Sequence, residues 1–179
     1  EEAREIMDNY RREKLRMLAV LDVPKDTDEA AFRKNLAQTK SFAAHFAATE
    51  EPPFWELGNE PDLSFFFPAG MPRYLEGFST LADAIHIADP NTCVLNGGLA
   101  NASHRKESAI RIREFFEGLA RGSRRPDRIA YHAHGPLFQA EQNALARLNQ
   151  AASEEGLSKL LWVDTETGVA AAGPDQENL

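Results

Sequence analysis

The sequence predicts an α/β fold, with about five parallel strands alternating with helices as in part of a (β/α)₈ barrel. Two observations predict this fold. Short apolar runs alternate with segments of helical periodicity along the 179 residues. The ends of the predicted strands also recur regularly, near positions 22, 60, 97, 132 and 164. A barrel takes about 31 residues per βα unit, so this chain supplies about six units rather than eight.

The predicted elements follow from apolar runs, helical spacing and chain-breaking residues. Strands are predicted over 15–23, 54–57, 92–95, 128–132 and 160–164. Helices are predicted over 3–14, from an Asp28 cap to Pro52-Pro53, around 74–85 and 112–119, and over 137–154 with Gly156 as C-cap. An open doubly wound sheet is the alternative, but it usually carries an early glycine-rich phosphate loop, and Asn96-Gly97-Gly98 is too short and too late for one.

Composition sets the class of protein. The length fits one domain over residues 1–179, and 42% hydrophobic residues support a packed core. No run reaches the roughly 20 apolar residues of a membrane span. A net charge of −8 argues against nucleic acid as the main partner. Because the chain starts at Glu1 rather than Met, we expect a processed, trimmed or longer natural protein. The compartment stays open, and secretion or the periplasm is compatible.

Polar residues of catalytic type gather at the predicted strand ends. Asn59, Glu60, His132, His134, Asp164 and Glu166 all lie at a carboxyl end or just beyond it, where α/β active sites are built. Glu60 and Glu166 are three βα units apart, which in a barrel puts them across the mouth from each other. Cleavage of a glycosidic bond needs such a pair, one acid for the leaving oxygen and one carboxylate at the anomeric carbon.

Two segments carry a family resemblance. Trp55-Glu56-Leu57-Gly58-Asn59-Glu60-Pro61-Asp62 resembles the fourth-strand signature of the clan A retaining glycoside hydrolases. Trp162-Val163-Asp164-Thr165-Glu166-Thr167-Gly168 resembles their seventh strand. The similarity is to families 39 and 79, and more distantly to family 5. It covers barrel strands three to seven, so the first two strands and the last strand are missing. We therefore expect further barrel segments or a partner chain to cover the open edges.

The resemblance implies roles for individual residues. Glu60 would be the general acid/base and Glu166 the nucleophile, whose negative charge would help to keep Glu60 protonated. Asn59 would bind the sugar 2-hydroxyl group, and no cofactor or metal is required. His132 and His134 stand near the place of a sixth-strand aromatic or histidine. Strand alternation puts both on one face, where each either faces the cleft or satisfies a backbone group.

Two residues of the first motif have open interpretations. Trp55 either stacks on substrate or packs its strand against a helix. Glu56 has the parity of Glu60, so it is expected to point inward, where a buried carboxylate needs a partner.

The predicted function is a retaining glycoside hydrolase acting on a poly- or oligosaccharide by double displacement. A non-catalytic carbohydrate-binding or scaffold fragment is the first alternative. A metal-dependent barrel enzyme is the second, with Glu60, His132, His134 and Glu166 as ligands. The sequence does not fix the sugar or the choice between exo and endo cleavage.

Overall fold

A computed structural model describes residues 8–9, 12–13, 17–101, 105–134 and 137–168, with the backbone alone at 134, 137–141 and 167–168. Most of the predicted helix over 3–14 and the tail over 173–179 lie outside this range. The strands are β1 (Leu18–Leu21), β2 (Phe54–Leu57), β3 (Cys93–Asn96), β4 (Ile129–His134) and β5 (Trp162–Gly168). The helices are α2 (Glu29–Glu50), α3 (Met71–Ala88), α4 (Lys106–Ala120) and α5 (Leu137–Glu154).

The strands are parallel and follow one another in chain order. β1, β2 and β3 form one sheet, and β4 and β5 form a second. Parallel bridges join the two sheets, from Leu95 to Arg128 and from Leu99 to Tyr131. The buried amide of Asn96 strengthens this junction, since it accepts a hydrogen bond from the Ala130 amide at 2.9 Å and donates to the Ala130 carbonyl at 3.0 Å. The strands therefore make one arc of a barrel wall, and the predicted fold class is confirmed.

The predicted helix boundaries hold because they rest on local chemistry. The Asp28 carboxylate accepts from the Ala31 amide at 2.8 Å and caps α2. The helix ends before Pro52, with Glu51 in the left-handed region. Gly156 also has a positive φ, of 72°, two residues after α5.

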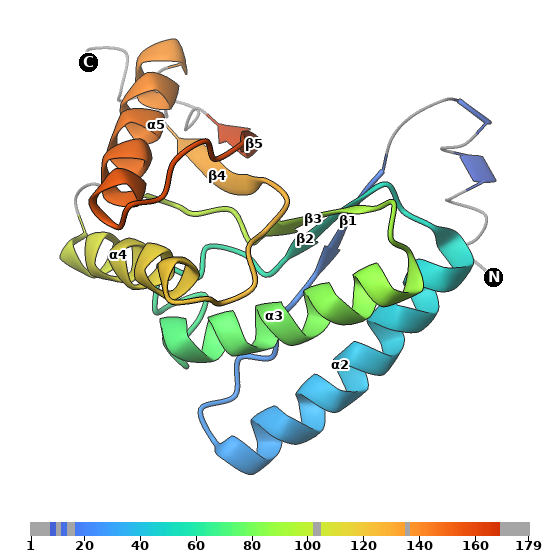
Figure 1. Ribbon diagram of the computed structural model, residues 1–179. Coiled ribbons are helices and arrows are strands. Elements are labelled where there is room, and N and C mark those ends of the chain that lie inside the picture. Colours follow the sequence, from blue (N-terminus) through green and yellow to red (C-terminus); the bar gives the residue numbers. More distant parts are fainter. Residues whose placement is uncertain (1–7, 10–11, 14–16, 102–104, 135–136, 169–179) are drawn as a thin grey trace, which may run out of the picture.

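Helices cover the outer side of the arc (Figure 1), with α2 and α3 alongside the β1–β3 sheet. Trp55 and Leu57 face these helices and are fully buried. On the opposite face, Val20 is the register partner of Glu56 and is 65% exposed. Among the described strands, neither β1 nor β5 pairs along its outer edge. The arc is therefore open on its inner side at β1.

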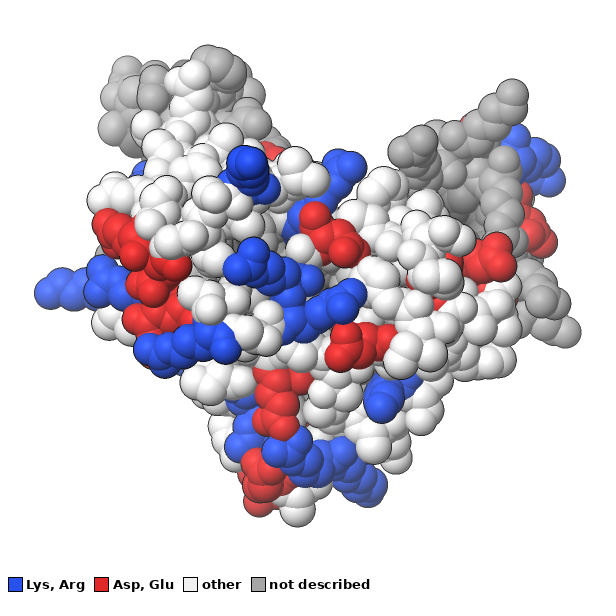
Figure 2. All heavy atoms as spheres, viewed as in Figure 1, with Lys and Arg blue, Asp and Glu red and all other residues white. Residues whose placement is uncertain are grey.

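The outer surface carries both signs of charge. Figure 2 shows acidic and basic side chains interspersed over α2, α3 and α4. Glu29 of α2, for example, pairs with Arg33 at 2.6 Å and with Arg73 of α3 at 2.7 Å. Within the described part of the chain, no helix combines the length and apolar character needed to cross a bilayer.

Tyr74 of α3 joins the ends of β2 and β3. Its hydroxyl group donates to the Leu57 carbonyl at 2.9 Å and accepts from the Gly97 amide at 2.7 Å, and the side chain is fully buried. Gly97 lies against the neighbouring turn, since a Cβ there would be 2.6 Å from the carbonyl carbon of Gly58. The turns that follow β2 and β3 are thus fixed to each other and to α3.

Replacing Tyr74 with Phe should therefore destabilise the protein. The change leaves the Gly97 amide and the Leu57 carbonyl without this partner in a buried place, which costs about 1–3 kcal/mol. Urea denaturation followed by circular dichroism measures the effect. Ser41→Ala serves as the control. It removes an exposed hydroxyl group that donates a hydrogen bond to the Ala37 carbonyl, and it should change the free energy of unfolding by less than about 0.5 kcal/mol. Equal effects of the two variants would contradict the role given to Tyr74.

Candidate active site

Glu60 lies in the turn after β2, three residues beyond its end, in an unusual backbone conformation. Its φ is 44°, in the left-handed region, and its amide donates to the Gly98 carbonyl at 3.1 Å. The residue is 8% exposed. Strained backbone of this kind is tolerated where surrounding contacts hold it, often at functional sites. The turn places the Glu60 side chain inside the arc, facing β4.

His132 of β4 brings the two candidate catalytic residues together. Its Nδ1 atom is 3.0 Å from Glu60 Oε1 and 3.8 Å from Glu166 Oε2. The ring is 2% exposed, whereas the Glu166 side chain is 58% exposed. The two glutamates come from the turn after β2 and from β5, 106 positions apart in the sequence, and their carboxylates approach the same nitrogen atom.

This shared contact limits the separation of the two carboxylates. The two oxygens near Nδ1 are at most about 7 Å apart, and a retaining pair needs roughly 5–5.5 Å between carboxyl groups. The arrangement is therefore compatible with the retaining geometry.

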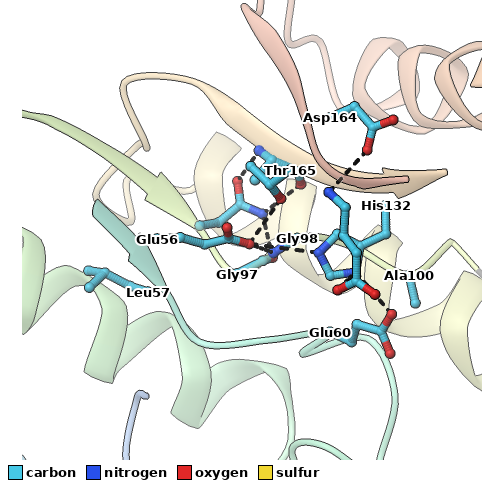
Figure 3. A network of polar contacts seen from close by, with 12 residues as sticks. Glu56, Leu57, Glu60, Gly97, Gly98, Ala100, His132, Asp164 and Thr165 are labelled. Carbon is cyan, nitrogen blue, oxygen red and sulfur yellow. Dashed lines mark hydrogen bonds and ion pairs between the residues drawn. The ribbon is translucent and has the colours of Figure 1, made fainter. Parts of the chain in front are cut away.

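Glu56 occupies the other side of the His132 ring (Figure 3). Its Oε1 atom accepts from the Gly98 amide at 2.7 Å and from the Thr165 hydroxyl at 3.1 Å, and it lies 3.8 Å from His132 Nε2. Strand parity predicts that Glu56 points inward, and it does, with 5% exposure. The sequence did not reveal these partners, because they come from β4, β5 and the turn after β3.

A bulge in β5 re-aims the side chains of this strand. Tyr131 pairs with Asp164, but the next residue, His132, pairs with Glu166, so Thr165 is the extra residue. As a result, Thr165 and Glu166 both reach the inner face. Asp164 points away from Glu56 and Glu60 in Figure 3, and its carboxylate accepts from the Glu166 amide at 3.3 Å.

The bulge also corrects one prediction. Asp164 and Glu166 do not lie at or beyond the end of their strand, because β5 extends over Trp162–Gly168. Likewise, β4 continues to His134, so His132 lies inside its strand. Parallel pairing continues past the register shift, and this pairing lengthens both strands beyond their apolar cores.

The structure places the other predicted substrate-binding residues, Trp55, Asn59 and His134, differently. Trp55 is not part of the cluster, and of its two open interpretations the structure supports packing against a helix rather than substrate contact. It is 1% exposed and packs edge-on against Phe46 of α2, with ring centroids 5.7 Å apart, because its strand parity is opposite to that of Glu56. Asn59 is partly exposed and immediately precedes Glu60. The His134 side chain lies outside the described residues.

Gly98 is a site residue that the sequence analysis missed. A Cβ at this position would overlap Nε2 and Cδ2 of His132, so the imidazole ring lies directly on the Gly98 backbone. The Gly98 amide binds Glu56, and its carbonyl binds the Glu60 amide. Two adjacent glycines after a predicted strand are the signal that could have indicated this close approach of backbone and ring.

The charges around His132 favour its protonated form. Burial would lower the pKa of His132, but hydrogen bonds to Glu56 and Glu60 and the charges of Glu60 and Glu166 outweigh it and raise the pKa to about 9. Both ring nitrogens face carboxylate oxygens, which only accept hydrogen bonds when ionised. Within the described residues, no group of three or more His, Cys, Asp or Glu side chains is arranged to hold a metal ion.

Comparison with known proteins identifies the fold. No family model and no curated protein sequence matches this chain. A glucosidase from Croceicoccus marinus matches with a TM-score of 0.69 and 13% identity, over 96% of this chain and 38% of the glucosidase. A monomeric β-xylosidase from Caulobacter crescentus CB15 matches with a TM-score of 0.57 and 21% identity, over 84% and 33% of the two chains. A GH39 β-xylosidase from Caulobacter crescentus matches with a TM-score of 0.57 and 22% identity, over 86% of this chain and 32% of the xylosidase.

The chain shares the partial-barrel fold of these solved glycosidase structures. It spans about a third of the length of these solved structures, so the fold is that of a partial barrel, as the sequence resemblance implies. At these identities the likeness concerns the fold. The chemistry of the site depends on the side chains described above.

The raised pKa of His132 predicts a pH dependence of stability. The folded protein holds this proton up to about pH 9, whereas the unfolded chain releases it near its ordinary value of 6.5. The stabilisation is complete below pH 6.5 and is lost as the pH rises through about 9. We expect the free energy of unfolding to decrease by up to about 3 kcal/mol across this range.

Urea denaturation across this pH range measures the decrease. His132→Gln should remove this part of the pH dependence. His45→Gln, at an exposed position of α2, should retain it. The assignment to His132 would be wrong if both variants kept the wild-type pH profile.

Proposed function

We propose that this protein is a retaining glycoside hydrolase, with Glu60 as the general acid/base and Glu166 as the nucleophile. The observation that carries the proposal is the convergence of Glu60, from the turn after β2, and Glu166, from β5, on one imidazole nitrogen. The glycosidase-type fold supports it. The alternative metal site receives no comparable support, since both ring nitrogens of His132 face carboxylates.

The proposed reaction has two displacements. A Glu166 carboxylate oxygen attacks the anomeric carbon, and the bond from this carbon to the leaving oxygen breaks while Glu60 donates a proton to that oxygen. The product is a glycosyl ester of Glu166. In the second step Glu60 removes a proton from water, the water oxygen bonds to the anomeric carbon, and the ester bond to Glu166 breaks. The anomeric configuration is retained.

His132 supplies a reason why Glu60 can donate a proton in such a charged site. The His132 Nδ1 atom lies 3.0 Å from Glu60 Oε1. An imidazolium beside a carboxylate holds the same number of protons as a neutral imidazole beside a carboxylic acid. The pair thus holds one proton, which resides on His132 at rest and can pass from Nδ1 to Glu60 as Glu60 protonates the leaving oxygen. Glu166 is more exposed than Glu60 and faces the open side of the arc, where a sugar can reach it.

The proposed substrate is an O-glycoside of a poly- or oligosaccharide. The solved structures with this fold include a glucosidase and two β-xylosidases, so aryl β-glucosides and aryl β-xylosides are the first substrates to test. Activity is measured on the product of the complete natural reading frame. Binding of an oligosaccharide without release of reducing ends would instead favour the non-catalytic carbohydrate-binding alternative.

Glu166→Ala should abolish turnover, because it removes the attacking carboxylate. Added azide should then restore turnover, since azide can enter the vacated space and attack the anomeric carbon. The product should be a glycosyl azide with inverted configuration, identified by proton NMR. Glu114→Ala, at an exposed position of α4, serves as the control and should retain wild-type activity. A Glu166→Ala enzyme with wild-type rates would refute the proposal.

Glu60→Gln should slow cleavage according to the leaving group. We expect a loss of about 10²–10⁴-fold with an alkyl or sugar leaving group, which needs protonation. The loss in the first displacement should be much smaller with a dinitrophenyl leaving group, which departs without a proton. Comparison of kcat/KM for the two substrate types measures this difference. An equal loss for both would show that Glu60 is not the acid.

A further inference from the structure

The mechanism does not use Glu56, although this residue is among the most buried acidic groups of the described chain. It is 5% exposed and lies on the inner face of β2, four residues before Glu60. An ionised carboxylate in such a place is unfavourable unless donors surround it. One oxygen, Oε1, makes all three contacts given above, with Gly98, Thr165 and His132. The residue is thus held at a fixed place in the site.

The three contacts come from different parts of the arc. Thr165 belongs to β5, which is separated from β2 by β3 and β4 in the order of strands. The hydrogen bond from Thr165 to Glu56 therefore crosses the inside of the arc. Its donor, Thr165, is the residue next to Glu166. Backbone pairing does not make this link. Through it, Glu56 sets the position of the strand segment that carries the proposed nucleophile.

The contact with His132 fixes the direction of the imidazole ring. Nε2 faces Glu56, so the opposite nitrogen, Nδ1, faces Glu60 and Glu166. The Gly98 backbone lies against the same edge of the ring and leaves no space for a side chain. The ring is therefore enclosed on the Glu56 side, and its second nitrogen is left to the two proposed catalytic carboxylates.

We propose that Glu56 is a positioning residue of this active site: it orients His132 toward Glu60 and Glu166 and ties the Glu166 strand to the turn after β3. This inference rests on the proposed function for its catalytic meaning. His132 is faced by Glu56 from β2, by Glu60 from the turn after β2 and by Glu166 from β5. Of these, Glu56 alone is not required by the reaction.

The substitution Glu56→Gln separates charge from hydrogen bonding. A glutamine can keep an acceptor oxygen at the Oε1 position for Gly98 and Thr165, so these two bonds can survive. It loses the negative charge beside Nε2. We therefore expect a folded protein in which His132 holds its proton at least tenfold more weakly than in the wild type.

NMR titration of the His132 ring carbons, without substrate, measures this change directly. His132→Gln assigns the signal among the five histidines. Glu50→Gln is the matched control, because Glu50 is also a buried glutamate but lies at the end of α2. The control should leave the His132 titration unchanged. The same His132 titration in wild type and Glu56→Gln would overturn the proposal. A wild-type His132 that titrates at its ordinary value would also overturn it, without any variant.

The kinetic measurement distinguishes positioning from a merely structural role. In Glu56→Gln, kcat should fall while KM stays nearly constant, and the alkaline limb of the kcat profile should move to lower pH. A structural role alone would lower stability and leave the pH profile in place, which would refute the inference. Because the titration needs no substrate, an inactive wild-type protein with the expected titration shift would refute the proposed glycosidase and leave the Glu56–His132 coupling standing.

Discussion

The interior of this barrel segment depends on one buried cation placed among carboxylates. His132 is almost fully enclosed, and three glutamates, from β2, the turn after β2 and β5, face its ring. Buried charges are tolerated only when they are paired, so neither the imidazolium nor Glu56 and Glu60 could occupy this place alone. The pairing therefore specifies which strand residues point inward. It also explains why a backbone without a side chain, at Gly98, is required against the ring.

The turns after β2 and β3 serve this charge arrangement. Tyr74 binds both turns, and Gly97 allows their backbones to touch. The same contact positions the Gly98 carbonyl for the Glu60 amide, which stabilises the left-handed conformation of Glu60. Helix packing on the outer face is thus coupled to the direction of one carboxylate on the inner face. A loss of packing at α3 would consequently reach the site through hydrogen bonds rather than through direct contact.

The sequence predicted those features that depend on local chemistry. The Asp28 cap, the chain break at Pro52 and the glycine after α5 each act within a few residues, and the structure has them where the sequence placed them. The inward direction of Glu56 followed from strand alternation. The bulge at Thr165 could not be predicted, because it depends on how β5 pairs with β4 and leaves no local signal. Trp55 shows the same limit, since the motif left substrate stacking and helix packing open, and the folded strand places the ring against α2.

The bulge also explains how one short strand can contribute both to the framework and to the chemistry. In a regular strand, Asp164 and Glu166 would share a face, and Thr165 would point to the helices. The extra residue instead brings Thr165 and Glu166 to the inner face together. Thr165 then fixes the strand to Glu56, and Glu166 remains exposed toward the open side of the arc. A fixed residue beside an accessible one suits a nucleophile that must keep its position while a sugar approaches it.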